Sequence, residues 1–293
     1  MKTPITILAP AKINLFLHVL GRRDNGYHNL QSLIMFADFG DHVTLKPSDT
    51  LGLTLHGDYA GALNTSEKDT SENSSNILIK ALWVIAKRAG QTPAFDITLT
   101  KNIPLGAGLG GGSADAAALI RALCDLWDID SQSDTFKQLL FALGADVPAC
   151  FNNAPCQIKG TGEDVFKAPD LFDIPALLIH PNKQCSTKDV FSKAFKFSGE
   201  IDIPNKFESR DALMAFLKTT RNDLYAPAST LIPDIQEVLN AIKAQDNILY
   251  ASMSGSGSAC FGLFDTVQSA QHAAQIIKNL HPEWWVQAVT LKS

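Results

Sequence analysis

The sequence predicts an α+β protein with two domains. Its 293 residues are the usual length of two domains. Hydrophobic residues make up 45% of the chain and charged residues 19%, which is enough apolar surface to bury cores. Segments with strand-like composition alternate with segments of helical spacing, a pattern typical of an α+β fold. We place the boundary near residue 160, giving domains at residues 1–160 and 161–293.

In the N-terminal domain, apolar and β-branched runs predict strands at residues 5–20, 43–45, 51–55 and 95–99. The strands at residues 43–45 and 51–55 are expected to form a short meander. The polar stretch 58–75 predicts a loop, with Ser75 positioned to cap the next helix. Apolar residues at helical spacing predict helices at residues 76–88, 115–127 and 134–143.

The C-terminal domain shows the same alternation of strand and helix patterns. Strands are predicted at residues 176–180, 247–253, 259–264 and 285–291. Helices are predicted at residues 187–196, 210–219, 233–244 and 267–280. The sequence contains no internal repeat.

Composition excludes several classes of partner. The formal net charge of −5 argues against binding to nucleic acid or to a membrane surface, and no apolar run reaches the roughly 18 residues of a membrane span. The five cysteines are odd in number and form no Cys-x-x-Cys pair, which argues against a disulfide framework or a zinc site. We therefore expect a cytoplasmic protein, in which an anionic substrate would have to be captured by a local positive site.

A glycine-rich run is the most informative feature, with five glycines between Gly106 and Gly112 ahead of a helix. Glycine lets the backbone approach a ligand closely, and a helix N-terminus offers unpaired N–H groups to an anion. The run lacks the lysine of a P-loop, and Asp125 or Asp128 could only weakly complete a dinucleotide fingerprint. The remaining alternative is that the run makes only a tight, glycine-rich turn and binds no ligand. We assign phosphate binding to Pro104, Leu105, Gly106, Ala107, Gly108, Leu109, Gly110, Gly111, Gly112, Ser113 and Ala114.

Two charged residues are candidates for catalysis. Lys12 interrupts an apolar strand pattern, and a buried ammonium is costly unless it is paired. Asp146 follows the end of a predicted helix, which is an unfavourable place for a carboxylate. The alternatives are a lysine whose ammonium reaches solvent from a strand edge and an aspartate that only makes a turn.

Three segments in this order resemble the motifs of the GHMP kinases, which include galactokinase, homoserine kinase and mevalonate kinase. They are Ala9–Leu15, Pro104–Ala114 and Met253–Phe261, and together they span nearly the whole chain. The resemblance implies a two-domain GHMP kinase fold, with an N-terminal domain like domain 2 of ribosomal protein S5 and a ferredoxin-like C-terminal domain. It also implies ATP and Mg²⁺, although the sequence does not identify the metal ligands.

Further stretches resemble the branch of this family that phosphorylates a cytidine diphosphate-linked methylerythritol. They are Gly21–His28, Gly144–Pro148 and Asn222–Leu224. Two residues depart from the branch pattern. Asn25 stands where aspartate is usual and should still make the turn, whereas Ala114 replaces a serine, so that Ser113 must serve alone.

The resemblance also implies roles for individual residues. Asp146 would face the acceptor hydroxyl, with Lys12 close to it. The cytosine would stack on Tyr27, with a second stacking position at Phe191, and would be hydrogen-bonded by His28. The remaining positions implied near substrate or adenine are Asn14, Thr187 and Asn76.

Two other interpretations stay open at this point. The chain could be a different GHMP kinase, which would share the three motifs without needing Tyr27 and His28. It could also be a catalytically silent ligand sensor on the same fold, although the presence of both Lys12 and Asp146 argues against this. We expect a monomer or a weak homodimer.

Overall fold

The computed structural model describes residues 3–63, 67–193 and 196–293, and the chain divides into two compact units. The first unit comprises the N-terminal segment up to Ala11, Phe39–Leu105 and Gly110–Asn153. The second comprises Lys12–Asp38, Gly106–Leu109 and Ala154–Ser293. The units therefore interleave along the sequence, and three segments contribute residues to both: β1 (Ile5–Arg22), β2 (His28–Pro47) and the glycine loop.

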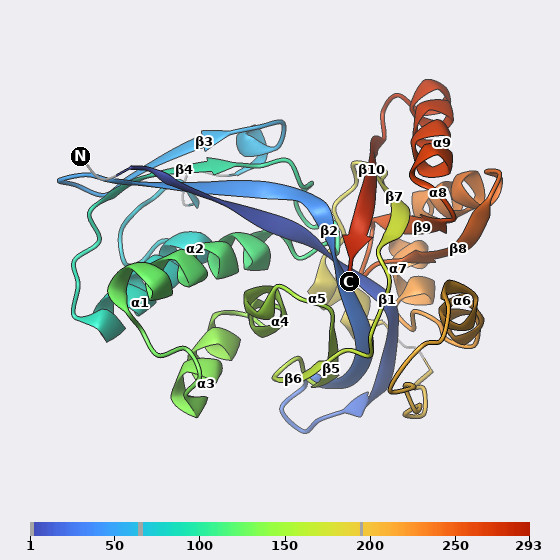
Figure 1. Cartoon of the computed structure of the whole chain (residues 1–293), viewed down its shortest axis with the longest axis horizontal. Coiled ribbons are helices and arrows are strands. Elements are labelled where there is room, and N and C mark those ends of the chain that lie inside the picture. The colour runs from blue at the N-terminus through green and yellow to red at the C-terminus, as the bar shows by residue number, and fades with distance from the viewer. Residues whose placement is uncertain (1–2, 64–66, 194–195) are drawn as a thin grey trace. The chain divides into compact units, whose positions relative to one another are not determined.

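In the first unit, three paired strands lie beside a group of helices (Figure 1). β3 (Gly52–His56) pairs in parallel with β4 (Phe95–Thr100), which pairs antiparallel with the C-terminal half of β2. The α-helices are α1 (Ile77–Ala89), α2 (Gly111–Trp127), α3 (Asp134–Leu143) and α4 (Val147–Asn152). A 3₁₀ turn, η1 (Ala60–Ala62), lies between β3 and α1. Helices α1 and α2 pack side by side (Figure 1).

The ends of α1 show how local chemistry sets the boundaries of a helix. Asn76, not Ser75, is the N-cap, and its Oδ1 accepts a hydrogen bond from Leu78 N at 3.0 Å. Gly90 ends the helix in the left-handed conformation that glycine favours. The helix is confirmed, but its start and its cap lie one residue later than predicted.

In the second unit, a sheet runs in the order β2, β10, β7, β9 and β8. Its C-terminal strands are β7 (Ile174–His180), β8 (Ile248–Met253), β9 (Cys260–Phe264) and β10 (Trp285–Lys292). The short strands β5 (Cys156–Gly160) and β6 (Asp164–Lys167) form a hairpin that pairs with β2 through β5. The helices are α5 (Thr187–Ser192), α6 (Arg210–Lys218), α7 (Tyr225–Leu231), α8 (Asp234–Lys243) and α9 (Val267–Leu280).

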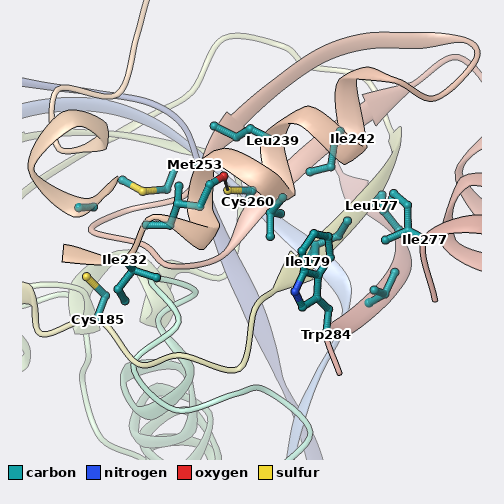
Figure 2. Packing of buried hydrophobic residues seen from close by; sticks show 14 of the residues in the cluster. Leu177, Ile179, Cys185, Ile232, Leu239, Ile242, Met253, Cys260, Ile277 and Trp284 are labelled. Atoms are coloured by element: carbon teal, nitrogen blue, oxygen red, sulfur yellow. Dashed lines mark hydrogen bonds between the residues drawn. The ribbon is translucent and has the colours of Figure 1, made fainter. Parts of the chain in front are cut away.

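Apolar side chains from the strands, α8 and α9 form the core of this unit (Figure 2). Ile242 of α8 and Ile277 of α9 are fully buried, and Trp284 closes the cluster just before β10. Burying a large apolar side chain contributes about 1.5–3 kcal/mol. This core therefore supplies the main driving force that brings the C-terminal helices onto the sheet.

The structure corrects several predicted elements. β3 pairs in parallel with β4 instead of forming a meander with the strand before it. The prediction missed the first half of β2 and also the elements α4, α7, β5 and β6. The helix predicted at 187–196 ends at Ser192, and residues 194–195 lie outside the described part of the chain. Within the described residues, every helix is too short or too polar to cross a lipid bilayer.

Gly262 offers a test of the packing of the second core. A Cβ at this position in β9 would lie 2.5 Å from Ile242 Cγ2 and 2.9 Å from Ile248 Cδ1. Overpacking of a buried site typically costs about 1–3 kcal/mol, so we expect Gly262→Ala to lower the free energy of unfolding by that amount. Gly199→Ala is the control, because a Cβ there meets no atom within 4 Å. Denaturant unfolding followed by circular dichroism measures both, and equal stability of the two variants would contradict the described packing.

Candidate active site

Lys12 and Asn14 project from the same face of β1 into the second unit. They are two residues apart on a strand, so their side chains point the same way. Lys12 is only 3% exposed, and its Nζ donates to Asn14 Oδ1 at 2.9 Å. Asn14 Nδ2 in turn donates to Ser32 Oγ at 2.8 Å. Lys12 is therefore a buried ammonium within a polar network, and it does not reach solvent from a strand edge.

The middle of the glycine loop, Gly106–Leu109, belongs to the second unit, and its carbonyl groups are bonded within that unit. Four successive carbonyl oxygens each accept one hydrogen bond. Gly106 O accepts from Cys185 N, Ala107 O from Ala259 N, Gly108 O from Ser254 Oγ and Leu109 O from Lys12 N, over distances of 2.9–3.2 Å. These bonds fix the path of the loop.

The N–H groups of the loop are oriented differently. In the described part of the chain, none of the backbone N–H groups from Gly106 to Ser113 donates a hydrogen bond. Those of Gly111 to Ser113 are the first N–H groups of α2, which a helix cannot satisfy internally. A run of unpaired donors at a helix N-terminus is suited to binding an anion.

The glycines of the loop serve two different needs. Gly106, Gly108 and Gly110 have φ values of 62°, 75° and 68°, which side chains disfavour. Gly112 is different: it lies in the first turn of α2, is exposed, and a Cβ there would meet only Ile77 Cγ2 at 3.4 Å. Internal packing therefore does not require glycine at position 112, and the position is open to a ligand.

The loop between β8 and β9 is held by Asn14, which the resemblance placed near the substrate, and by Asn222, to which it assigned no individual role. Asn14 N donates to Ser254 Oγ at 3.2 Å. Asn222 Nδ2 donates to the carbonyl oxygens of Met253 and Gly255, both at 2.8 Å, and its Oδ1 accepts from Leu224 N. The segment Asn222–Leu224 had been noted only for its resemblance. Its positioning role depends on contacts distant in sequence that no local pattern reveals.

Aromatic side chains gather elsewhere in the second unit. The ring of His28 stacks on Phe191 of α5 with centroids 4.9 Å apart, and Phe197 lies 6.3 Å from His28. Burial, and to a smaller degree the charge of Arg22, lowers the pKa of His28. Tyr27 is 59% exposed, so the structure places His28, and not Tyr27, against Phe191.

Two residues close in sequence to the aromatic group of Tyr27, His28, Phe191 and Phe197 make hydrogen bonds of their own. Thr187, the first residue of α5, shares a 2.8 Å hydrogen bond between its hydroxyl group and that of Ser256. Asn25 makes the expected turn: its Oδ1 accepts from Tyr27 N, and Gly26 adopts a φ of 88°. The departure at Asn25 therefore leaves the turn intact.

In the first unit, three helix N-termini carry predicted site residues: Asn76 precedes α1, Ser113 lies in the first turn of α2, and Asp146 precedes α4. A Cβ on Gly144 would lie 3.9 Å from Ser113 Oγ, so the α2 and α4 starts are near neighbours. The prediction that Asp146 occupies an unfavourable place for a carboxylate is wrong. The residue stands at the start of α4, where the helix dipole favours a negative charge, and not only after the end of α3.

Asn76 already has structural partners for its side chain. Besides the bond from Leu78 N, its Nδ2 donates to Glu67 O at 2.9 Å. All five cysteines are buried, as expected of small apolar side chains. Within residues 3–63, 67–193 and 196–293, no group of three or more His, Cys, Asp or Glu side chains could hold a metal ion.

Comparison with known proteins adds two family matches. The GHMP kinase N-terminal domain matches residues 76–154, and the GHMP kinase C-terminal domain matches residues 210–287. The 4-diphosphocytidyl-2-C-methyl-D-erythritol kinase of Paramagnetospirillum magneticum is 39% identical, covering 99% of this chain and 100% of its own. The kinase of the same name from Rhizobium etli is 38% identical, covering 97% and 94%.

Solved structures agree with the sequence matches. A crystal structure of 4-(cytidine 5'-diphospho)-2C-methyl-D-erythritol kinase is similar to this chain with a TM-score of 0.76 and 31% identity, covering 99% of this chain and 100% of that one. Homoserine kinase from Cytophaga hutchinsonii has a TM-score of 0.66 at 23% identity, covering 99% and 96%. The second likeness concerns the fold alone.

Proposed function

The chain belongs to the GHMP kinases and, within them, to the 4-diphosphocytidyl-2-C-methyl-D-erythritol kinases, and we propose that it transfers the γ-phosphoryl group of ATP to the 2-hydroxyl of 4-diphosphocytidyl-2-C-methyl-D-erythritol. This is the kinase step of the non-mevalonate route to isoprenoid precursors. The expected two-domain α+β fold is the fold of this family. We keep residues 1–160 and 161–293 as the proposed domains and the cytoplasm as the proposed location.

The observation that carries the proposal is the polarity of the glycine loop. Its carbonyl oxygens from Gly106 to Leu109 are bonded to the protein, while the N–H groups from Gly106 to Ser113 have no partner among the described residues. Fixed, unpaired amides at the start of α2 supply preorganised donors for phosphate oxygens without reorganisation during the reaction. Among the predicted nucleotide contacts, Pro104, Leu105 and Ala114 are buried or half-buried and serve to shape the loop.

Mg²⁺ is the ion that offsets the charge of a triphosphate in phosphoryl transfer. The described residues provide no acidic cluster that could hold it on their own. We therefore propose that it is bound mainly by phosphate oxygens, as is usual for this ion, and we assign no protein ligand to it.

Asp146 and Lys12 are the proposed catalytic residues. Asp146 accepts a hydrogen bond from the acceptor hydroxyl and orients it, and then takes its proton. A carboxylate is a weak base for an alcohol, but a loose transition state needs positioning more than early proton removal. Lys12, held by Asn14 in a buried network, stabilises negative charge that develops during transfer.

The cytidine end of the substrate is assigned to the aromatic group of the second unit. Phe191 and the exposed Tyr27 offer ring faces to the base, and His28 offers a ring nitrogen as a hydrogen-bonding group. Asn14 and Thr187 are proposed to contact the rest of the substrate. Because Oδ1 of Asn76 caps α1 and its Nδ2 donates to Glu67 O, we assign its proposed role near adenine to its backbone.

Acceptor preference tests the proposed substrate. With ATP fixed, we expect the cytidylated diol to be phosphorylated faster than methylerythritol phosphate, homoserine or mevalonate. Stacking of a base on aromatic rings contributes about 1–3 kcal/mol, which the other three acceptors cannot gain. Steady-state kcat/KM for the four acceptors measures this, and faster turnover of any of the other three would reject the substrate while leaving the family intact.

Asp146→Asn tests the proposed base. We expect kcat to fall by at least about 10²-fold, the lower end for a positioned general base, with ATP affinity nearly unchanged. Thermal melting checks that the variant stays folded, which we expect because the Asp146 side chain makes no capping hydrogen bond to α4. Turnover within threefold of the unmodified enzyme would remove Asp146 from the mechanism.

Gly112→Ala tests the phosphate loop. Alanine at this helical, exposed position should raise stability by roughly 0.5–1 kcal/mol, yet its methyl group should block approach of the phosphates. We expect ATP affinity, measured by calorimetry, to fall about tenfold, or about 1.4 kcal/mol. Gly61→Ala in the same unit, where a Cβ meets nothing within 4 Å, is the control. Unchanged ATP affinity in a stabilised Gly112→Ala protein would place the phosphates elsewhere.

A further inference from the structure

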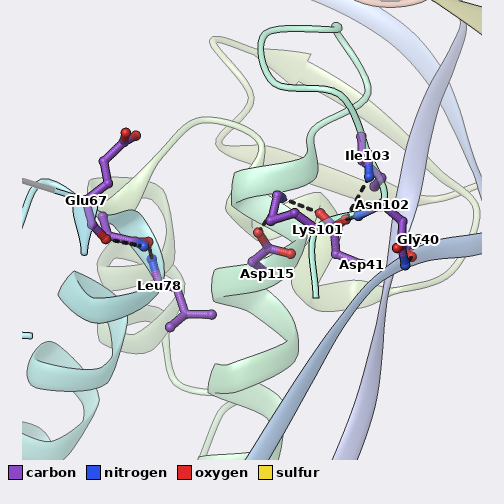
Figure 3. A network of polar contacts seen from close by, with 9 residues as sticks. Gly40, Asp41, Glu67, Leu78, Lys101, Asn102, Ile103 and Asp115 are labelled. Carbon is purple, nitrogen blue, oxygen red and sulfur yellow. Dashed lines mark hydrogen bonds and ion pairs between the residues drawn. The ribbon is translucent and has the colours of Figure 1, made fainter. Parts of the chain in front are cut away.

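Three charged side chains are buried together in the first unit (Figure 3). Asp41 belongs to β2, Lys101 follows directly after β4, and Asp115 lies on α2. Their exposed fractions are 0%, 2% and 3%. The sequence analysis assigned none of them a role, and none belongs to the proposed catalytic or substrate-binding residues.

Asp41 fixes the chain that leads into the glycine loop. Its Oδ1 accepts hydrogen bonds from Asn102 N at 2.5 Å and Ile103 N at 2.8 Å, and its Oδ2 accepts from Lys101 Nζ. Asn102 Nδ2 also donates to Gly40 O at 2.9 Å. The three residues before Pro104 are therefore tied to β2 (Figure 3).

Lys101 extends this attachment to the far end of the loop. Its Nζ also donates to Asp115 Oδ2 at 2.7 Å, and Asp115 lies four residues after Gly111, where α2 begins. Both ends of the loop, Leu105 and Gly110, belong to the first unit, as do all three charged residues. One ammonium thus connects the segment before the loop with the helix after it.

The arrangement is costly for a purely structural device. Two carboxylates share one ammonium away from water, and Asp115 Oδ1 is buried without a hydrogen-bond partner among the described residues. Burial, with the nearby Asp41 carboxylate, raises the pKa of Asp115 to about 7 despite the opposing charge of Lys101. Apolar side chains in place of a buried ion network often give equal or greater stability, so stability alone does not account for it.

We propose that Lys101 and Asp115 are positioning residues for nucleotide binding: the ion pair between them fixes the two ends of the glycine loop relative to each other and thereby holds its N–H groups in the arrangement that binds a triphosphate. This inference rests on the proposed function of the loop. Loss of the connection should weaken ATP binding and leave the affinity for the cytidylated acceptor almost unchanged, because no residue of the network belongs to the aromatic group.

Two variants at one position separate the connection from the charge. Asp115→Asn and Asp115→Leu both remove the carboxylate and leave Lys101 paired with Asp41. Only asparagine keeps an oxygen that can accept from Lys101 Nζ, whereas leucine is the better helix former of the two. A deficit of the leucine variant relative to the asparagine variant therefore does not come from net charge or helix propensity, and thermal melting checks whether the larger leucine side chain strains the buried site.

ATP affinity by calorimetry, the KM values for ATP and for the cytidylated acceptor, and thermal melting are measured for both variants. We expect Asp115→Leu to bind ATP about tenfold more weakly than Asp115→Asn, with acceptor KM values that agree within about twofold. Equal ATP affinity of the two folded variants would overturn the proposal, as would a parallel rise in both KM values of the leucine variant.

If Asp115→Leu does not fold, Asp115→Ala, which also removes the oxygen but adds no bulk and leaves Lys101 paired with Asp41, replaces it in the comparison, and failure of both to fold would show a purely structural role and overturn the proposal. Failure of the unmodified protein to bind ATP would instead reject the proposed function. Weaker ATP binding by Gly112→Ala, together with equal affinity of the two Asp115 variants, would reject only the present inference.

Discussion

The hydroxyl group of Ser254 holds together the part of the candidate site that lies in the second unit. It accepts a hydrogen bond from Asn14 N and donates one to Gly108 O, so it joins segments of all three motifs. Ser254 is fully buried, and its own N–H donates to Ala259 O. Leaving one such buried group unsatisfied costs about 1–3 kcal/mol, so these segments keep one arrangement together. Lys12 gains its fixed position from the same cluster through Asn14.

Much of the fold follows from local sequence patterns. α3 and α9 begin and end where helical spacing predicts, because their apolar residues recur at that period, and Thr266 caps the start of α9 by accepting from Ser269 N. The first half of β2 could not be recognised in this way. Gln31 and Ser32 interrupt its apolar pattern, and both are buried because they bond Ile201 and the Asn14 network. Pairing with distant residues, which no local window contains, makes those polar side chains compatible with a strand.

The site was predictable in its parts but not in their connections. The glycine run predicts a phosphate loop on physical grounds, since glycine and a following helix suffice for that inference. The buried ammonium of Lys12 also followed from its apolar surroundings, and its burial is confirmed. The contacts of Asn222, Ser254 and Lys101 could not be predicted, because each acts through partners more than ten residues away. The stacking of His28 on Phe191 likewise depends on tertiary structure.

The interleaving of the two units limits how this protein can be divided. A fragment of residues 161–293 would contain β10 but not Phe36 and Ala37, which pair with it on β2. It would also lack Leu17, which bridges to Asn222. Its sheet would end in an unpaired edge, a surface prone to aggregation. The two matched family domains are therefore units of sequence, and we do not expect either to fold when it is expressed or exchanged alone. A working chimaera would have to carry Lys12–Asp38 together with the C-terminal part that this segment completes.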